Sequence, residues 1–240
     1  MERFIEGQVL LINKPYTWTS FDAVNKIKSI IKRAASTPAP IVRKKFKIGH
    51  AGTLDPLATG LLIICTGKFT KRIEEFQAQE KEYIGTFCLG STTASFDLEQ
   101  PIDATYPTAH ITPELIQQAT KIFLGEIDQT PPIFSAIKIK GDRAYELARK
   151  GQVPEMKSRR VTVSAFDITN IAMPSIDFRI VCSKGTYIRS LARDLGLALN
   201  SGAHLTSLCR TRIGEFKLED AKDIHQFEAE LQIQKDTPHQ

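Results

Sequence analysis

The 240-residue sequence lacks the features of a secreted, membrane-spanning or metal-binding protein. Its four cysteines, at positions 65, 88, 182 and 209, form no C-x-x-C pair, and its histidines never pair at metal-ligand spacing. Neither a disulfide framework nor a zinc site is therefore expected. No apolar run approaches the roughly 20 residues of a membrane helix, and residues 1–6 lack the apolar core of a secretory signal. We expect a soluble, cytoplasmic protein with no membrane partner.

What is present is an ordinary globular composition, with 42% hydrophobic and 25% charged residues. The chain is long enough for one large domain or two small ones. Apolar periodicity predicts strands at residues 8–12, 61–65, 81–89, 133–140, 161–168 and 176–182, and helices at 20–31, 112–124, 143–150 and 186–200. Ser20 is the expected N-cap of the first helix, with Phe21, Val24, Ile27, Ile30 and Ile31 on its apolar side.

The order of these elements bears on the fold class. Strands and helices mix without a regular βαβ rhythm, and several strands alternate apolar and polar residues. This pattern favours an α+β fold with a mainly antiparallel sheet over a doubly wound parallel one. No clean domain break is visible, so we expect a single domain over residues 1–240, with a basic insertion at 131–160 standing off the body.

The positive charge is concentrated in two segments. The net charge is only +5, but residues 32–47 hold six basic side chains and no acid, and residues 138–160 hold eight basic and three acidic ones. Residues 215–236 carry an acidic excess. A charge run is most often a solvated surface, but two basic segments also fit a nucleic-acid partner.

The densest chemical segment is residues 47–60, Lys-Ile-Gly-His-Ala-Gly-Thr-Leu-Asp-Pro-Leu-Ala-Thr-Gly. Its glycines let the backbone approach a ligand, and such a loop can hold the Asp55 carboxylate at a cleft wall as a nucleophile. The spacing matches neither G-x-x-x-x-G-K-[ST] nor G-x-G-x-x-G, which argues against a phosphate loop. An ordinary glycine-rich turn capped by Asp55 fits the spacing equally well.

A second constellation lies at residues 182–189, where a strand ends at Gly185 and a helix begins. Arg189 at the helix start can pair with a buried acid, and Tyr187 can pack on a planar ring. A surface arginine and a core tyrosine are the simpler interpretation of these two residues. Tyr83, within an apolar strand, is likewise first explained as a core aromatic.

These residues resemble a known family closely. Residues 50–60, HAGTLDPLATG, look like the signature of the TruB-type tRNA pseudouridine synthases. The likeness continues through four further ordered stretches over about 200 residues. They are Asn13-Lys14-Pro15 with Ser20-Phe21-Asp22, Lys81-Glu82-Tyr83, the segment from Pro131 to Lys138, and residues 183–189 followed by 202–210 with Leu208 and Arg210.

The resemblance implies a pseudouridine synthase catalytic fold, with a central mixed, mainly antiparallel sheet flanked by helices and a basic RNA-gripping insertion. It implies an isomerase acting on the uridine at position 55 of the tRNA T-loop, with tRNA as partner and no obligate protein partner. It also implies roles for seven residues: Asp55 as nucleophile, Tyr83 on the target base, Arg189 paired with Asp55, Tyr187 and Leu208 lining the uridine pocket, His50 on the RNA, and Lys14 supporting the site.

Pseudouridine formation breaks the N1–C1′ bond, turns the uracil and rejoins it through C5, so it needs no cofactor or metal. The sequence leaves open whether Asp55 attacks covalently or promotes a glycal-type route. Many bacterial relatives carry a C-terminal PUA-type module; this chain ends at Gln240, so we expect a short form without it. The alternatives are a non-catalytic RNA-binding or chaperone protein of the same shape, a synthase for another RNA, and, disfavoured, a phosphate-loop nucleotide enzyme.

Overall fold

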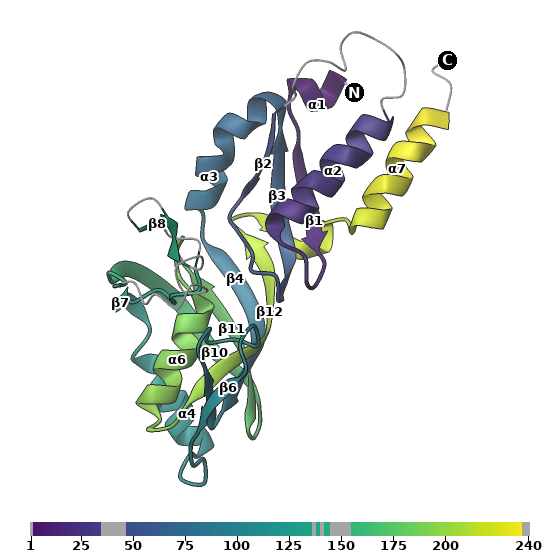
Figure 1. Ribbon diagram of the computed structural model, residues 1–240. Coiled ribbons are helices and arrows are strands. Elements are labelled where there is room, and N and C mark those ends of the chain that lie inside the picture. Colours follow the sequence, from purple (N-terminus) through teal and green to yellow (C-terminus); the bar gives the residue numbers. More distant parts are fainter. Residues whose placement is uncertain (1, 35–46, 136–137, 140–141, 145–154, 237–240) are drawn as a thin grey trace. The chain divides into compact units, whose positions relative to one another are not determined.

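The computed structural model describes residues 2–34, 47–135, 138–139, 142–144 and 155–236 (Figure 1). The chain forms two compact units. The first consists of Met1–Lys81 and Cys209–Gln240, and the second of Glu82–Leu208. The fold is α+β, as the sequence predicts, and the strand pairs that we describe below are antiparallel. Whether the chain is a single domain stays a prediction.

The strands of the first unit surround β3 (Ala58–Thr66), whose residues are almost all buried. β1 (Val9–Lys14) pairs with β3 antiparallel from Val9 opposite Cys65 to Lys14 opposite Gly60. β2 (Ile48–Ala51) also pairs with β3, and β13 (Phe216–Lys217) pairs with the end of β12 (Ala203–Ile213). Because the chain passes from β2 to β3 through residues 52–57, the sheet fixes both ends of the predicted Asp55 loop.

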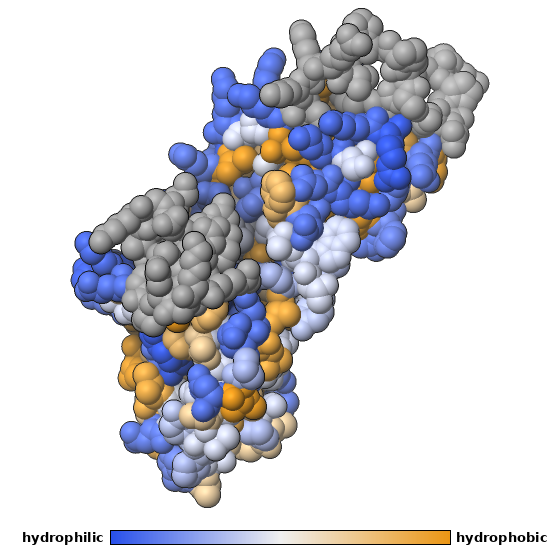
Figure 2. Space-filling model, viewed as in Figure 1, coloured by the Kyte–Doolittle hydropathy of each residue, from blue (hydrophilic) through white to orange (hydrophobic). Residues whose placement is uncertain are grey.

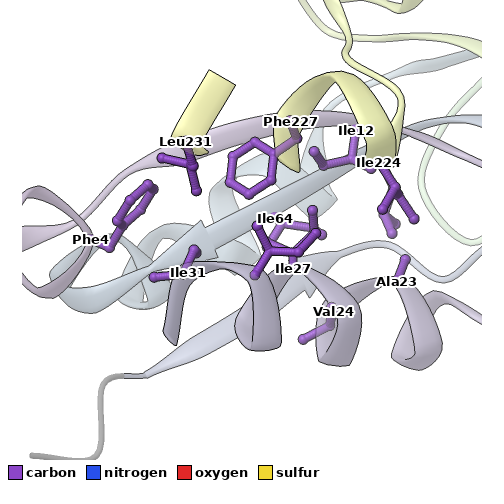
Figure 3. Close-up of a cluster of buried hydrophobic side chains, with 12 residues drawn as sticks. Phe4, Ile12, Ala23, Val24, Ile27, Ile31, Ile64, Ile224, Phe227 and Leu231 are labelled. Carbon is purple, nitrogen blue, oxygen red and sulfur yellow. The ribbon is translucent and has the colours of Figure 1, made fainter. Parts of the chain in front are cut away.

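Both faces of β3 are covered, because successive strand residues point to opposite sides. Leu62 and Ile64 pack with α2 (Ser20–Ala34) and α7 (Ile224–Asp236), and Figure 3 shows Ile64 between side chains of these two helices. Leu61, Ile63 and Cys65 pack on the other face with Phe76 of α3 (Ile73–Ala78). Three short helices complete the unit: α1 (Glu2–Glu6), η2 (Gly67–Arg72) and η3 (Leu218–Asp220).

The start of α2 corrects two expectations. Ser20 is not the N-cap; Thr19 is, because its Oγ1 accepts from Asp22 N at 3.0 Å while Asp22 Oδ2 accepts from Thr19 N at 2.9 Å. Phe21 is 66% exposed, since one helical residue after Ser20 turns it away from the buried stripe of Val24, Ile27, Ile30 and Ile31. Over α2, the face shown in Figure 2 is mainly hydrophilic.

The sheet of the second unit has the strand order β4 (Lys81–Leu89), β11 (Ser175–Cys182), β10 (Arg159–Ala172) and β7 (Gly125–Gln129). β4 begins at Lys81, the last residue of the N-terminal segment of the first unit. Small pairs form from β5 (Ser91–Thr93) with β6 (Ile102–Thr105) and from β8 (Lys138–Ile139) with β9 (Asp142–Arg143). Among the described residues of this unit, the helices α4 (Pro113–Lys121) and α6 (Ile188–Ala198) contact each other.

Most predicted elements are confirmed. The helix at 112–124 starts with Thr112 capping Leu115 N, as expected from Pro113. Of the strand predicted at 133–140, residues 138–139 form β8, residues 133–135 are not strand, and residues 136, 137 and 140 lie outside the described residues. Arg143 lies in β9 rather than in a helix. Residues 145–154, which hold most of the predicted helix 143–150, are outside the described residues, as are residues 35–46 of the first basic segment and parts of the insertion 131–160. No helix in the described part of the chain is long and apolar enough to cross a membrane.

Candidate active site

Asp55 lies in the short loop between β2 and β3, and its side chain is half-buried. Gly52 at the start of the loop and Gly60 in β3 have backbone conformations that other residues rarely adopt, with φ of 94° and 102°. A Cβ on Gly60 would lie 2.4 Å from the carbonyl oxygen of Arg210, so this position also demands glycine for space. Asp55 O accepts from Ala58 N at 3.1 Å, which closes the turn.

The residues on either side of Asp55 are held by the chain around the start of α2. The buried Ser20 donates its hydroxyl to Leu54 O at 3.1 Å and accepts from Leu54 N at 2.8 Å. Thr17 N donates to Pro56 O at 2.9 Å. The backbone is therefore fixed immediately before and after the carboxylate.

Lys14 adds a third restraint on the loop. Its side chain is fully buried, and its Nζ donates to the carbonyls of Pro15 at 3.0 Å, Trp18 at 2.5 Å and Pro56 at 3.4 Å. Burial lowers the pKa of Lys14 to about 8, although the nearby Asp55 carboxylate acts in the opposite direction. The structure thus places Lys14 close to Asp55 and bonds it to the loop, and its role in the reaction stays a prediction.

His50 and Arg210 lie near the start of the same loop: His50 is in β2, and Arg210 of β12 bonds Gly52. Arg210 is 1% exposed and donates from Nε to Leu61 O at 2.8 Å and from Nη2 to Gly52 O at 3.1 Å. Burial, followed by the neighbouring Arg210 charge, lowers the pKa of His50, so the imidazole is neutral at pH 7. A neutral imidazole can exchange hydrogen bonds or stack on a base, but it does not bring a positive charge to the loop.

The second unit holds the other candidates. Tyr83 is buried on β4, Leu208 is half-buried on β12, and Tyr187 is the residue immediately before α6. Arg189 is buried in the first turn of α6, so the simpler interpretation of a surface arginine is wrong.

The partner of Arg189 within the second unit is one that the sequence did not reveal. Its Nε lies 3.5 Å from Asp97 Oδ2, and both side chains are almost fully buried. Its Nη1 donates to Ser95 O at 3.2 Å. These contacts restrain the direction of the Arg189 side chain within the second unit. The predicted pairing of Arg189 with Asp55, which belongs to the first unit, stays a prediction.

The described residues include no group of three or more His, Cys, Asp or Glu side chains placed to hold a metal ion. The side chains at the Asp55 loop are a carboxylate whose two neighbours are held by hydrogen bonds, a buried amine and a neutral imidazole.

Comparison with known proteins identifies the family. Residues 40–188 match the model of the TruB family pseudouridylate synthase N-terminal domain, and residues 189–240 match that of the tRNA pseudouridylate synthase B C-terminal domain. The tRNA pseudouridine synthase B of Flavobacterium johnsoniae is 62% identical over 96% of this chain and 99% of its own length. That of Phocaeicola vulgatus is 58% identical over 93% of each chain.

A solved structure has a similar fold. A chain in the crystal structure of a Cbf5-Nop10-Gar1 complex matches with a TM-score of 0.73 and 29% identity over 98% of this chain. This chain spans 57% of the length of that one. The family that the motifs predicted is therefore confirmed: this chain belongs to the TruB family of pseudouridylate synthases, which are isomerases.

Proposed function

We propose that this chain converts the uridine at position 55 of the tRNA T-loop to pseudouridine, with Asp55 as the nucleophile. The observation that carries the proposal is the Asp55 loop, whose backbone is bonded at Leu54 by Ser20 and at Pro56 by Thr17 and Lys14. A nucleophile gains rate when its direction is set before the substrate arrives, because the ordering is then part of folding. Membership of the TruB family and the names of the relatives support tRNA as the substrate.

In this mechanism the target nucleotide leaves its stack before it reaches the carboxylate. Extruding a base costs a few kcal/mol, which contacts to RNA phosphates and stacking on protein side chains offset. His50, as a neutral ring, is suited to stacking, and the basic segments 32–47 and 131–160 are the proposed grip on the phosphates. Binding that depends on such contacts weakens as salt rises.

The chemical steps use the remaining candidates. Asp55 adds to the ribose or the uracil, or promotes loss of the base, and the N1–C1′ bond breaks. The uracil turns and bonds to C1′ through C5, and any bond to Asp55 breaks so that the carboxylate is released. A base removes the C5 proton and N1 takes up a proton, so the product is an isomer of the substrate. We assign Tyr83 to holding the uracil and assisting that proton transfer, and Tyr187 and Leu208 to the walls of the uridine pocket. Arg189, in this proposal, keeps the carboxylate ionised.

Replacing Asp55 by Asn tests the proposal. We expect Asp55→Asn to abolish pseudouridine formation while leaving tRNA affinity nearly unchanged, because the amide keeps the shape but loses the nucleophile. Asp220→Asn, at an exposed position, is the matched control and should retain full activity. Measurable turnover by Asp55→Asn, with the amide verified intact by mass spectrometry, would remove Asp55 from its assigned role.

A further inference from the structure

The carboxamide of Gln129 binds both backbone polar groups of Tyr187. Gln129 is the last residue of β7 and is 1% exposed. Its Oε1 accepts from Tyr187 N at 2.7 Å, and its Nε2 donates to Tyr187 O at 3.1 Å. Tyr187 is extended, with φ −102° and ψ 113°, so its N–H and C=O point to the same side, as in a strand. A primary amide offers the matching acceptor and donor in one plane.

This contact anchors the residue at which α6 begins. Tyr187 is the N-cap of α6, and its side chain makes no capping hydrogen bond with the described residues. The next turn is also tied to the residue after Gln129, because Ser190 Oγ donates to Thr130 O at 2.8 Å. The end of β7 thus fixes the start of α6, the turn that carries Arg189.

The ring of Tyr187 is held by the strand next to β7. Arg159 of β10 is directly opposite Gln129 in the β7–β10 pair. Its guanidinium carbon lies 4.6 Å from the centroid of the Tyr187 ring, which is a cation–π geometry. Two facing strand residues therefore restrain one tyrosine, Gln129 through the backbone and Arg159 through the ring.

We propose that Gln129 is a positioning residue for the reaction, which sets the direction of Tyr187 and the start of α6 through its two hydrogen bonds. This inference rests on the proposed function, in which Tyr187 forms a wall of the uridine pocket. Loss of the amide should therefore slow the reaction of bound tRNA rather than weaken tRNA binding.

Two variants separate the two hydrogen bonds. Gln129→Glu keeps an acceptor for Tyr187 N–H but replaces the donor with an oxygen facing Tyr187 O, whereas Gln129→Met removes both bonds at similar volume. Gln118→Glu, on the exposed side of α4, introduces the same charge away from Tyr187 and is the matched control. The measurements are the single-turnover rate of pseudouridine formation with enzyme in excess, tRNA affinity and thermal unfolding.

We expect the single-turnover rate of each folded Gln129 variant to fall roughly 10–100-fold while tRNA affinity is retained, since small misplacement of a positioning group costs rates of this order. A wild-type single-turnover rate in either folded variant would overturn the role of Gln129, even if its thermal stability were reduced. Absence of pseudouridine with the wild-type chain and Gln118→Glu would instead defeat the proposed function itself.

Discussion

At the scale of single residues, buried polar side chains order the Asp55 loop through hydrogen bonds to its backbone. Ser20, Lys14 and Arg210 come from distant parts of the sequence, and each bonds backbone groups of residues 52–61. A buried backbone carbonyl without a donor is costly, so a loop that turns sharply inside a protein needs such side chains. The loop therefore requires these particular side chains as well as the Asp55 carboxylate.

The depressed pKa of Lys14 predicts a pH dependence of stability. The pKa is about 8 in the folded chain and 10.5 as an ordinary lysine, so between these values the folded state binds fewer protons than the unfolded state. The free energy of unfolding contributed by Lys14 therefore rises as the pH rises from 8 toward 10.5, and is lost as the pH falls through 8.

Urea unfolding of the wild type and Lys14→Met over pH 7 to pH 10 measures this dependence, and Lys32→Met, at an exposed position of α2, is the control for loss of one lysine. The stability difference between wild type and Lys14→Met should shift in favour of the wild type above pH 8. A difference that stays constant across this range would show that burial does not perturb Lys14.

At the scale of elements, two adjacent hydroxyl residues at the start of α2 have different tasks. Thr19 caps the helix with Asp22, whereas Ser20 bonds the backbone of Leu54 beside the candidate nucleophile. Thr19→Ala should cost about 1 kcal/mol of stability through the lost cap. Ser20→Ala should cost about 1–3 kcal/mol, because both polar groups of Leu54 lose their partner.

Their effects on activity should differ more than their effects on stability. Ser20→Ala should lower the single-turnover rate of pseudouridine formation roughly tenfold or more, because the residue before Asp55 is released. Thr19→Ala should leave the rate of folded enzyme near that of the wild type. Equal rates for the two variants, each corrected for folded fraction, would argue that Ser20 does not order the loop.

The elements themselves were largely predictable from apolar periodicity. β4, β10, β11, α2 and α6 all appear where alternating or helical spacing places them. β7 and β12 escaped prediction, because Gly125–Gln129 and Ala203–Ile213 hold many polar residues, some of which the fold uses for ion pairs and backbone contacts. The short strands β2, β5 and β6 were not predicted either.

The candidate site was predictable only where a motif carried it. The signature around Asp55 and the family resemblance pointed to all seven candidate residues. Asp97, Ser95 and Gln129 had no such signal, because their partners Arg189 and Tyr187 are 58 to 94 residues away in the chain. Contacts of this separation depend on the packing of the unit and not on any local pattern.

At the scale of the whole molecule, the candidate residues are distributed over both units. Lys14, His50 and Asp55 belong to the first, and Tyr83, Tyr187, Leu208 and Arg189 belong to the second. The proposed reaction uses candidate residues of both units, so its tests need both units. Family membership gives the reaction class, while the nucleotide that is modified is the part of the proposal that needs direct measurement.

The most direct test maps pseudouridine by mass spectrometry in a tRNA transcript incubated with the purified chain and nothing else. A second transcript, in which the T-loop uridine at position 55 is replaced by cytidine, is the substrate control. We predict one pseudouridine at that T-loop position in the first transcript and none in the second. Unmodified T-loop uridine in the first transcript, or pseudouridine formed at other positions, would contradict the account.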